Sequence, residues 1–211
     1  LQIQSNHIQM SYYFMFVILF FVGAYFEDAY RKKELPHFFK ASGVLALAAV
    51  VGVCINISNL YHTYEYSKET MRGKSELKQE GAAASQTSSG LDRDYITNWS
   101  YGIGETLTLL VPNVKGGGSG STMSQSEAAM AKANPMYNGI YSQLPQYFGE
   151  QPWTAGPVYV GAFVMFLFVL GCFIVKGPLK WALLGATIFS ILLSWGKNFM
   201  GLTDFFIDYV P

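Results

Sequence analysis

The sequence predicts an all-α membrane protein with four transmembrane helices and one long extracytoplasmic loop. Three observations predict this fold class. Only 13% of the 211 residues are charged, the mean hydropathy is positive, and the apolar residues gather in four blocks. A soluble domain carries about a quarter charged residues. A deficit that is concentrated in blocks indicates membrane spans rather than a soluble core.

Each of the four apolar blocks is long enough to cross a bilayer. About 17 to 20 residues at 1.5 Å per residue cover a hydrocarbon core roughly 30 Å thick. The predicted spans are residues 8–26, 38–57, 158–175 and 179–195. Because the chain begins without Met and stops soon after an apolar aromatic run, we expect it to be an internal fragment of a longer protein.

Basic residues predict the orientation of the spans. Arg31, Lys32 and Lys33 follow the first span, and Lys176 and Lys180 lie at the short link between the third and fourth spans. By the positive-inside rule, both short links face the cytoplasm. The N-terminal segment, the long loop and the C-terminal tail are therefore expected on the extracytoplasmic side.

This topology divides the chain into three parts. Residues 1–58 form two spans, residues 59–156 form the extracytoplasmic loop, and residues 157–211 form two spans and an interfacial amphipathic tail. Within the loop, residues near 80–90 and 115–134 are rich in Gly, Ala and Ser and are expected to be flexible inserts.

The composition also argues against several classes of function. The net charge is zero, so nothing suggests a nucleic-acid partner. No metal site is expected from the three histidines, because His37 faces the cytoplasm in this topology and His7 and His62 lack ligand-like spacing. A divalent metal is possible at a carboxylate pair such as Asp92 and Asp94, but nothing in the spacing demands it, and the cofactor stays unknown.

Polar residues at the mouth of the first span are the first candidate site. Asn6, His7, Gln9 and Tyr12 precede or open the apolar block. Polar residues at a span mouth normally face protein or a water-filled cavity. They either bind a polar head group or are interfacial residues with no ligand.

Glu105 is the second candidate. It follows Gly102 and Gly104, and Trp99 and Tyr101 precede it. Glycines let the backbone approach a ligand, aromatic rings supply a stacking floor, and a carboxylate accepts protons or hydroxyl hydrogen bonds, which suits a sugar. The alternative is a Gly-rich turn in which Glu105 caps a short helix over "TLTLLV".

Lys197 follows the fourth span on its outer side. A cation at this position either extends to the phosphate of membrane lipid or binds the phosphate of a lipid-linked substrate.

Four stretches together resemble the YfhO family of bacterial multi-spanning membrane proteins. They are "NHIQMSYY", "WSYGIGETLTLLVPNVKGG", "YFGEQPWTAGPVYVGA" and "LLSWGKNF". The resemblance covers nearly all of the chain apart from the two inserts. The family is similar to the GT-C glycosyltransferases, which transfer a sugar from a polyprenyl-phosphate donor to an acceptor on the extracytoplasmic side.

The resemblance implies an enzyme of the bacterial cytoplasmic (inner) membrane that modifies a cell-envelope polymer or lipid. Glu105 is then the candidate catalytic carboxylate, and Trp99 and Tyr101 line the sugar pocket with it. Lys197 is the phosphate partner, while Asn6, His7, Gln9 and Tyr12 hold the head group. In such enzymes the principal catalytic acid usually lies in the first outer loop, which is expected to precede Leu1.

Two alternatives remain open at this point. A transporter or flippase component for a lipid-linked polymer would also have polar span mouths, but it needs ionisable or helix-breaking residues within the spans. The spans carry Lys40 near one end and no central charge, which counts against transport. A non-enzymatic scaffold whose loop binds envelope polymer is the second alternative.

Overall fold

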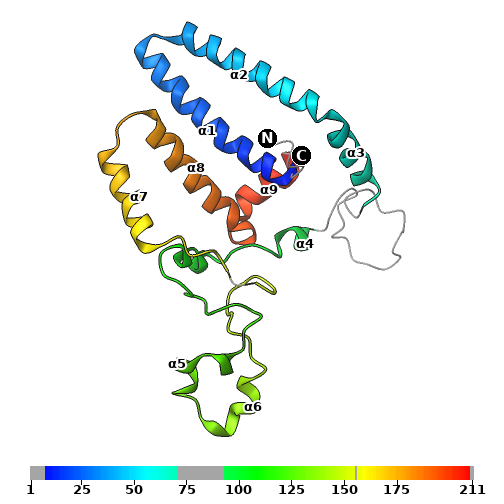
Figure 1. Ribbon diagram of the computed structural model, residues 1–211, viewed down its shortest axis with the longest axis vertical. Coiled ribbons are helices and arrows are strands. Elements are labelled where there is room, and N and C mark those ends of the chain that lie inside the picture. Colours follow the sequence, from blue (N-terminus) through cyan, green and yellow to red (C-terminus); the bar gives the residue numbers. More distant parts are fainter. Residues whose placement is uncertain (1–7, 71–92, 155, 210–211) are drawn as a thin grey trace. The chain divides into compact units, whose positions relative to one another are not determined.

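The computed structural model describes residues 8–70, 93–154 and 156–209 (Figure 1). These residues are mostly helical, and none of them forms a named strand. The helices are, in chain order, α1 (Ile8–Lys32), α2 (Leu35–Ile55), α3 (Ile57–Lys68), α4 (Arg93–Thr97), η1 (Ile103–Leu109), η2 (Met123–Gln125), α5 (Glu127–Met130), η3 (Pro135–Tyr137), α6 (Asn138–Tyr141), α7 (Ala162–Ile174), α8 (Pro178–Ser194), η4 (Gly196–Phe199) and α9 (Met200–Tyr209), where η marks a 3-10 helix.

The chain folds as two compact units. The first consists of Leu1–Arg93 and Ile174–Ile188, and so contains α1 to α3 and most of α8. The second consists of Asp94–Phe173 and Phe189–Pro211, and contains the central loop, α7, the end of α8, and α9.

The first two helices confirm that the chain has apolar helices long enough to cross a membrane. Gln9–Lys32 and Leu35–Ile55 have 24 and 21 residues. α1 runs six residues past the predicted apolar block, because charged residues beyond it pair one helical turn apart. Arg31 binds Glu27 at 2.5 Å and Lys32 binds Asp28 at 2.7 Å, and such pairs support a helix.

The second pair of predicted spans differs from the first. α7 has 13 residues, a length of about 20 Å at 1.5 Å per residue, which is less than the hydrocarbon core. It begins at Ala162 rather than near residue 158 because Gly161 has φ 113° and the N–H of Val160 donates to the carbonyl of Leu109 at 3.2 Å. Neither feature fits a continuing helix.

α8 is followed by a sharp change of direction. The segments Pro178–Ser194 and Gly196–Tyr209 meet at 112°. Among the described residues there are therefore two helices that can each cross a membrane, or three if the bent pair is one span. The structure does not show four.

The long loop contains short helices and isolated backbone bridges, and the flexibility of its two inserts stays a prediction. The insert near residues 80–90 lies outside the described residues. The insert at 115–134 contains η2 and α5, and isolated antiparallel bridges join Gly116 to Tyr147 and Thr122 to Pro145. The N–H of Met123 also donates to the carbonyl of Leu144 at 2.9 Å. Backbone hydrogen bonds thus join the second insert to residues 144–147.

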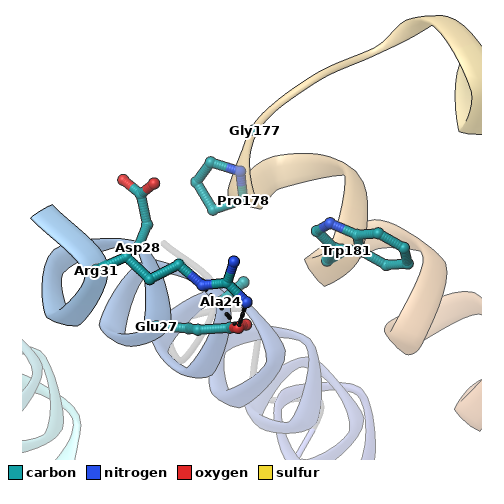
Figure 2. A pocket seen from close by; sticks show the side chains of 7 residues that line it. All are labelled: Ala24, Glu27, Asp28, Arg31, Gly177, Pro178 and Trp181. Carbon is teal, nitrogen blue, oxygen red and sulfur yellow. Dashed lines mark hydrogen bonds and ion pairs between the residues drawn. The ribbon is translucent and has the colours of Figure 1, made fainter.

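In the first unit, the Phe20 ring of α1 lies against Gly185 of α8. A Cβ atom on Gly185 would lie 2.9 Å from the Phe20 ring, so only glycine permits this approach. Beyond this point lies a cavity of about 460 Å³ (Figure 2). It is lined by Ala24, Glu27, Asp28, Arg31, Gly177, Pro178 and Trp181.

We expect the free energy of unfolding of Gly185→Ala to be about 1 to 3 kcal/mol lower than that of Gly43→Ala. The added methyl group would clash with the Phe20 ring, and overpacking of this kind is destabilising. Gly43 lies within α2 and has open space where a Cβ would go, so both substitutions share the gain in helix propensity and only one meets Phe20. Unfolding of the two variants in mixed detergent micelles measures the difference. Equal stabilities would contradict the close contact.

Candidate functional site

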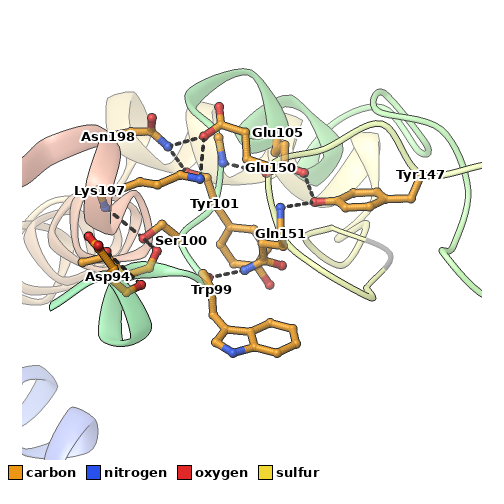
Figure 3. A network of polar contacts seen from close by, with 12 residues as sticks. Asp94, Trp99, Ser100, Tyr101, Glu105, Tyr147, Glu150, Gln151, Lys197 and Asn198 are labelled. Atoms are coloured by element: carbon orange, nitrogen blue, oxygen red, sulfur yellow. Dashed lines mark hydrogen bonds and ion pairs between the residues drawn. The ribbon is translucent and has the colours of Figure 1, made fainter. Parts of the chain in front are cut away.

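Three segments that are far apart in the sequence meet in the second unit (Figure 3). The N–H of Tyr101 donates to the carbonyl of Ser194 at 2.8 Å. The indole N–H of Trp195 donates to Thr106 Oγ1 at 2.8 Å, and the side-chain amide of Asn198 donates to the carbonyl of Tyr101 at 2.9 Å. These bonds join the glycine-rich stretch to the end of α8 and to η4.

Glu105 is completely buried and connects the glycine-rich stretch to Tyr147. Its Oε2 accepts a hydrogen bond from the N–H of Gly102 at 2.6 Å, and its Oε1 accepts one from the hydroxyl of Tyr147. The N–H of Glu105 donates to the carbonyl of Gly102 at 2.9 Å. Glu105 therefore caps the start of η1, as the second of the two sequence interpretations predicts.

The Tyr147 hydroxyl is held from two sides. It donates to Glu105 and accepts a hydrogen bond from the N–H of Gln151 at 3.2 Å. Burial, together with the hydrogen bond to the Glu105 carboxylate, raises the pKa of Tyr147 to about 12. The phenol therefore keeps its proton at neutral pH and remains a donor to the carboxylate.

Gly149 makes this arrangement possible. A Cβ atom at that position would overlap both Glu105 Oε1 and the Tyr147 hydroxyl. Any other residue would push the phenol and the carboxylate apart. The Gly in "YFGEQPW" is thus required by the close approach of two buried polar side chains.

An accessible polar cluster lies beside the buried pair. Lys197 Nζ is 3.6 Å from Glu150 Oε2, and their side chains are 40% and 45% exposed. Asn198 donates to the same carboxylate oxygen at 2.9 Å, and the backbone N–H of Lys197 donates to Ser100 Oγ at 2.9 Å. The cation and the carboxylate are therefore fixed next to the loop but remain open to a ligand.

Trp99 presents an exposed indole on the same loop. Trp99 is 52% exposed, and its backbone carbonyl accepts a hydrogen bond from the side-chain amide of Gln151. The backbone at Trp99 is thereby tied to the segment Tyr147–Gln151, while the ring stays accessible. Figure 3 shows the ring directed away from the hydrogen-bonded residues.

An apolar cavity of about 300 Å³ adjoins the cluster. Tyr101 lines this cavity and also accepts a hydrogen bond from Asn198. Two further lining residues take part in the same contacts: Thr106 accepts from the Trp195 indole, and the Ser194 carbonyl accepts from the Tyr101 N–H. The full lining is Tyr101, Thr106, Leu109, Pro157, Val158, Val160, Ser190, Ile191 and Ser194. A half-exposed cation and an apolar cavity are thus parts of one unit.

The structure brings together four of the residues that the sequence predicts for a site: Trp99, Tyr101, Glu105 and Lys197 all belong to the second unit. Gln9 and Tyr12 lie in the first turns of α1, within the first unit. Asn6 and His7 lie outside the described residues. The head-group role of these four residues stays a prediction.

Sequence reasoning did not single out Tyr147, Glu150, Gln151 or Asn198. Tyr147 and Glu105 are 42 residues apart, and Asn198 and Glu150 are 48 apart, so no local pattern connects them. The one available signal is that each lies next to a glycine or within two residues of one. Among the described residues, no group of three or more His, Cys, Asp or Glu side chains is arranged to hold a metal ion.

Comparison of the chain with models of known protein families, with curated proteins and with solved structures found no match. The candidate site is therefore defined by its own geometry.

We expect Tyr147→Phe to lower the free energy of unfolding by about 1.5 to 3 kcal/mol at pH 7, because it removes a hydrogen bond to a buried carboxylate. The folded-state pKa is raised to about 12, so the unfolded protein loses this proton first as the pH rises. The stabilisation is complete below about pH 10, the ordinary tyrosine value, and falls between pH 10 and 12.

Unfolding curves of the wild-type protein and the variant in detergent micelles, measured from pH 7 to 11, test this. The stability gap is expected to narrow above pH 10. Tyr66→Phe, at an exposed position in α3, is the control and should change little at any pH. A gap that stays constant up to pH 11 would show that the Tyr147 hydroxyl does not donate to a buried partner.

Proposed function

We propose that the chain is part of an integral membrane glycosyltransferase that uses a polyprenyl-phosphate-linked sugar and acts at the extracytoplasmic face. The acceptor is a cell-envelope polymer or lipid. The observation that carries the proposal is the position of Lys197. It is a half-exposed cation at the end of an apolar helix, beside an apolar cavity and an exposed aromatic loop.

The proposal includes four crossings of a bacterial cytoplasmic membrane. α1 and α2 supply two, and α7 together with the residues before it supplies the third. The 13-residue length of α7 is compatible with a crossing if the bilayer thins locally or flanking residues extend to the interface. The fourth crossing is α8, and the bend at Gly196 then turns η4 and α9 along the outer surface.

Lys197 suits the phosphate of a lipid-linked donor. Its present partner, Glu150, is 3.6 Å away and partly exposed, and exposed ion pairs of this kind contribute only about 0 to 1 kcal/mol. A donor phosphate can therefore replace Glu150 at small cost. During transfer, the departing phosphate gains negative charge, which a fixed cation stabilises.

The neighbouring residues suit the two ends of such a donor. The apolar cavity would receive the beginning of the lipid chain, while the Trp99 ring would stack against the sugar. Once released from Lys197, the Glu150 carboxylate would accept hydrogen bonds from sugar hydroxyls. These assignments use only side chains that a ligand can reach.

Glu105 is assigned a positioning role in this proposal. A general base has to come within about 2.6 to 3.2 Å of the proton it removes. Both Glu105 oxygens are occupied by Gly102 and Tyr147, and the residue is fully buried. Its predicted action as the catalytic base would require Tyr147 to move and stays a prediction.

We expect Lys197→Met to reduce sugar transfer at least about 100-fold, because a charge-stabilising group is lost. Lys197→Arg keeps the positive charge and should retain more of the activity. Lys132→Met removes an exposed cation outside the cluster and should leave transfer unchanged. The assay uses membranes that contain the full-length protein and a labelled polyprenyl-phosphate hexose, with label in the envelope fraction as the readout.

Transfer by Lys197→Met at the wild-type rate would remove the proposed phosphate contact. If the wild-type protein moved the labelled lipid across vesicle membranes without transferring its sugar, the flippase interpretation would replace the enzyme.

A further inference from the structure

The three faces of η1 have different surroundings. A 3-10 helix has three residues per turn, so residues three apart in the sequence lie on the same face. Two faces belong to the interior of the second unit: Glu105 and Thr108 are buried, and Thr106 and Leu109 line its apolar cavity. The third face carries Leu107 and Leu110, which are 57% and 42% exposed. This face is therefore apolar and exposed.

The exposed apolar surface continues past the end of η1 without a charge. Residues 106–114 read "TLTLLVPNV" and contain no charged side chain. Val111 and Val114 are 51% and 37% exposed. Glu105, the charged residue before this stretch, is withdrawn into the interior, and the next charged residue is Lys115. An exposed stretch of this composition gains free energy when it moves from water into lipid.

The backbone at the end of η1 is also suited to lipid. In the hydrocarbon region, backbone N–H and C=O groups have no water to bind and need partners within the protein. The carbonyl of Leu107 accepts from the N–H of Val111 at 2.9 Å, and the carbonyl of Leu109 accepts from the N–H of Val160 at 3.2 Å. Pro112 has no N–H. These groups are satisfied without water.

η1 is bonded to the ends of two apolar helices. The Val160–Leu109 hydrogen bond attaches it to the residues just before α7. The indole N–H of Trp195, which directly follows α8, donates to Thr106 Oγ1 at 2.8 Å. In the proposed topology, the start of α7 and the end of α8 both lie at the outer side of the membrane. η1 is then located where the two helices leave the bilayer.

The length of α7 indicates the depth of η1. The 13 residues of α7 cover about 20 Å of a hydrocarbon core that is roughly 30 Å thick. Residues 158–160 are apolar, non-helical and 44% to 81% exposed, and they can reach up to about 10 Å further. Because Leu109 is bonded to Val160, the end of η1 lies beside the residues that complete this crossing.

We propose that η1 is inserted into the extracytoplasmic leaflet of the bilayer, with Leu107, Leu110 and Val111 in contact with acyl chains. The occupant of the exposed face is lipid, because this face adjoins the apolar residues 158–160 that lead into α7. The cavity behind η1 then lies at the level of the acyl chains. The inference uses the crossings by α7 and α8 in the proposed topology, and it does not depend on sugar transfer.

Nitroxide labels on single cysteines in liposomes test the proposal. The full chain, with Cys54 and Cys172 replaced by Ala, receives Leu107→Cys or Leu110→Cys. Leu167→Cys, at an exposed position of α7, is the lipid reference, and Lys132→Cys, at an exposed charged position, is the water reference. Collisions of the nitroxide with oxygen, which concentrates in apolar surroundings, and with a water-soluble nickel chelate are measured.

We expect the labels at 107 and 110 to match the lipid reference, with frequent oxygen collisions and few nickel collisions. Frequent nickel collisions at 107 and 110, with a lipid-like reference at 167, would overturn the insertion of η1 and leave the topology intact. Few collisions with either reagent would show that protein covers this face, which also overturns the proposal. A water-like label at 167 would remove the crossing by α7 and the inference with it.

The reactivity of the unlabelled cysteines gives an independent measurement. A thiol reacts as its thiolate, and apolar surroundings raise the thiol pKa. A rise of one pKa unit lowers the thiolate fraction about tenfold. We therefore expect a water-soluble maleimide to react at least about tenfold more slowly at positions 107 and 110 than at position 132. The rates should become similar after unfolding in dodecyl sulfate, and similar rates in liposomes would contradict the insertion.

Discussion

The organisation of the central loop depends on one buried carboxylate. Glu105 is withdrawn from solvent completely, and its two oxygens accept hydrogen bonds from the Gly102 N–H and the Tyr147 hydroxyl. An unpaired charge in such a position would be very costly, so both donors have to be in place when the loop folds. The carboxylate therefore joins the residue before η1 to a segment of the loop more than forty residues later.

That constraint determines which residues a ligand can reach. Gln151 follows the tethered Tyr147 and binds the Trp99 carbonyl, while Glu150, between them, points to Lys197 and Asn198. The buried pair thus holds the loop, and the exposed side chains beside it are left for binding. The proposed binding of a lipid-linked substrate would use such a division, because the exposed side chains can bind while the buried pair keeps the loop ordered.

The sequence predicts the features that depend on composition and local spacing. The apolar blocks predict α1 and α2, and the acidic residue after a glycine predicts the cap of η1. The Tyr147 partner of Glu105 and the Ser100 partner of Lys197 are not predictable in this way, since hydrogen bonds across 42 and 97 residues leave no periodic pattern. Hydropathy also does not predict the length of α7. The residues "VYVG" are apolar, but they precede the helix because Gly161 has a positive φ and the Val160 N–H donates to the Leu109 carbonyl.

The central claim is that Glu105 and Tyr147 stabilise the loop through each other. A double-mutant cycle with Glu105→Ala, Tyr147→Phe and the combined variant measures this directly, with unfolding in detergent micelles at pH 7 as the readout. The account predicts a coupling free energy of about 1.5 to 3 kcal/mol, the range for a buried hydrogen bond to a charged group. Effects that add to within about 0.5 kcal/mol would contradict it.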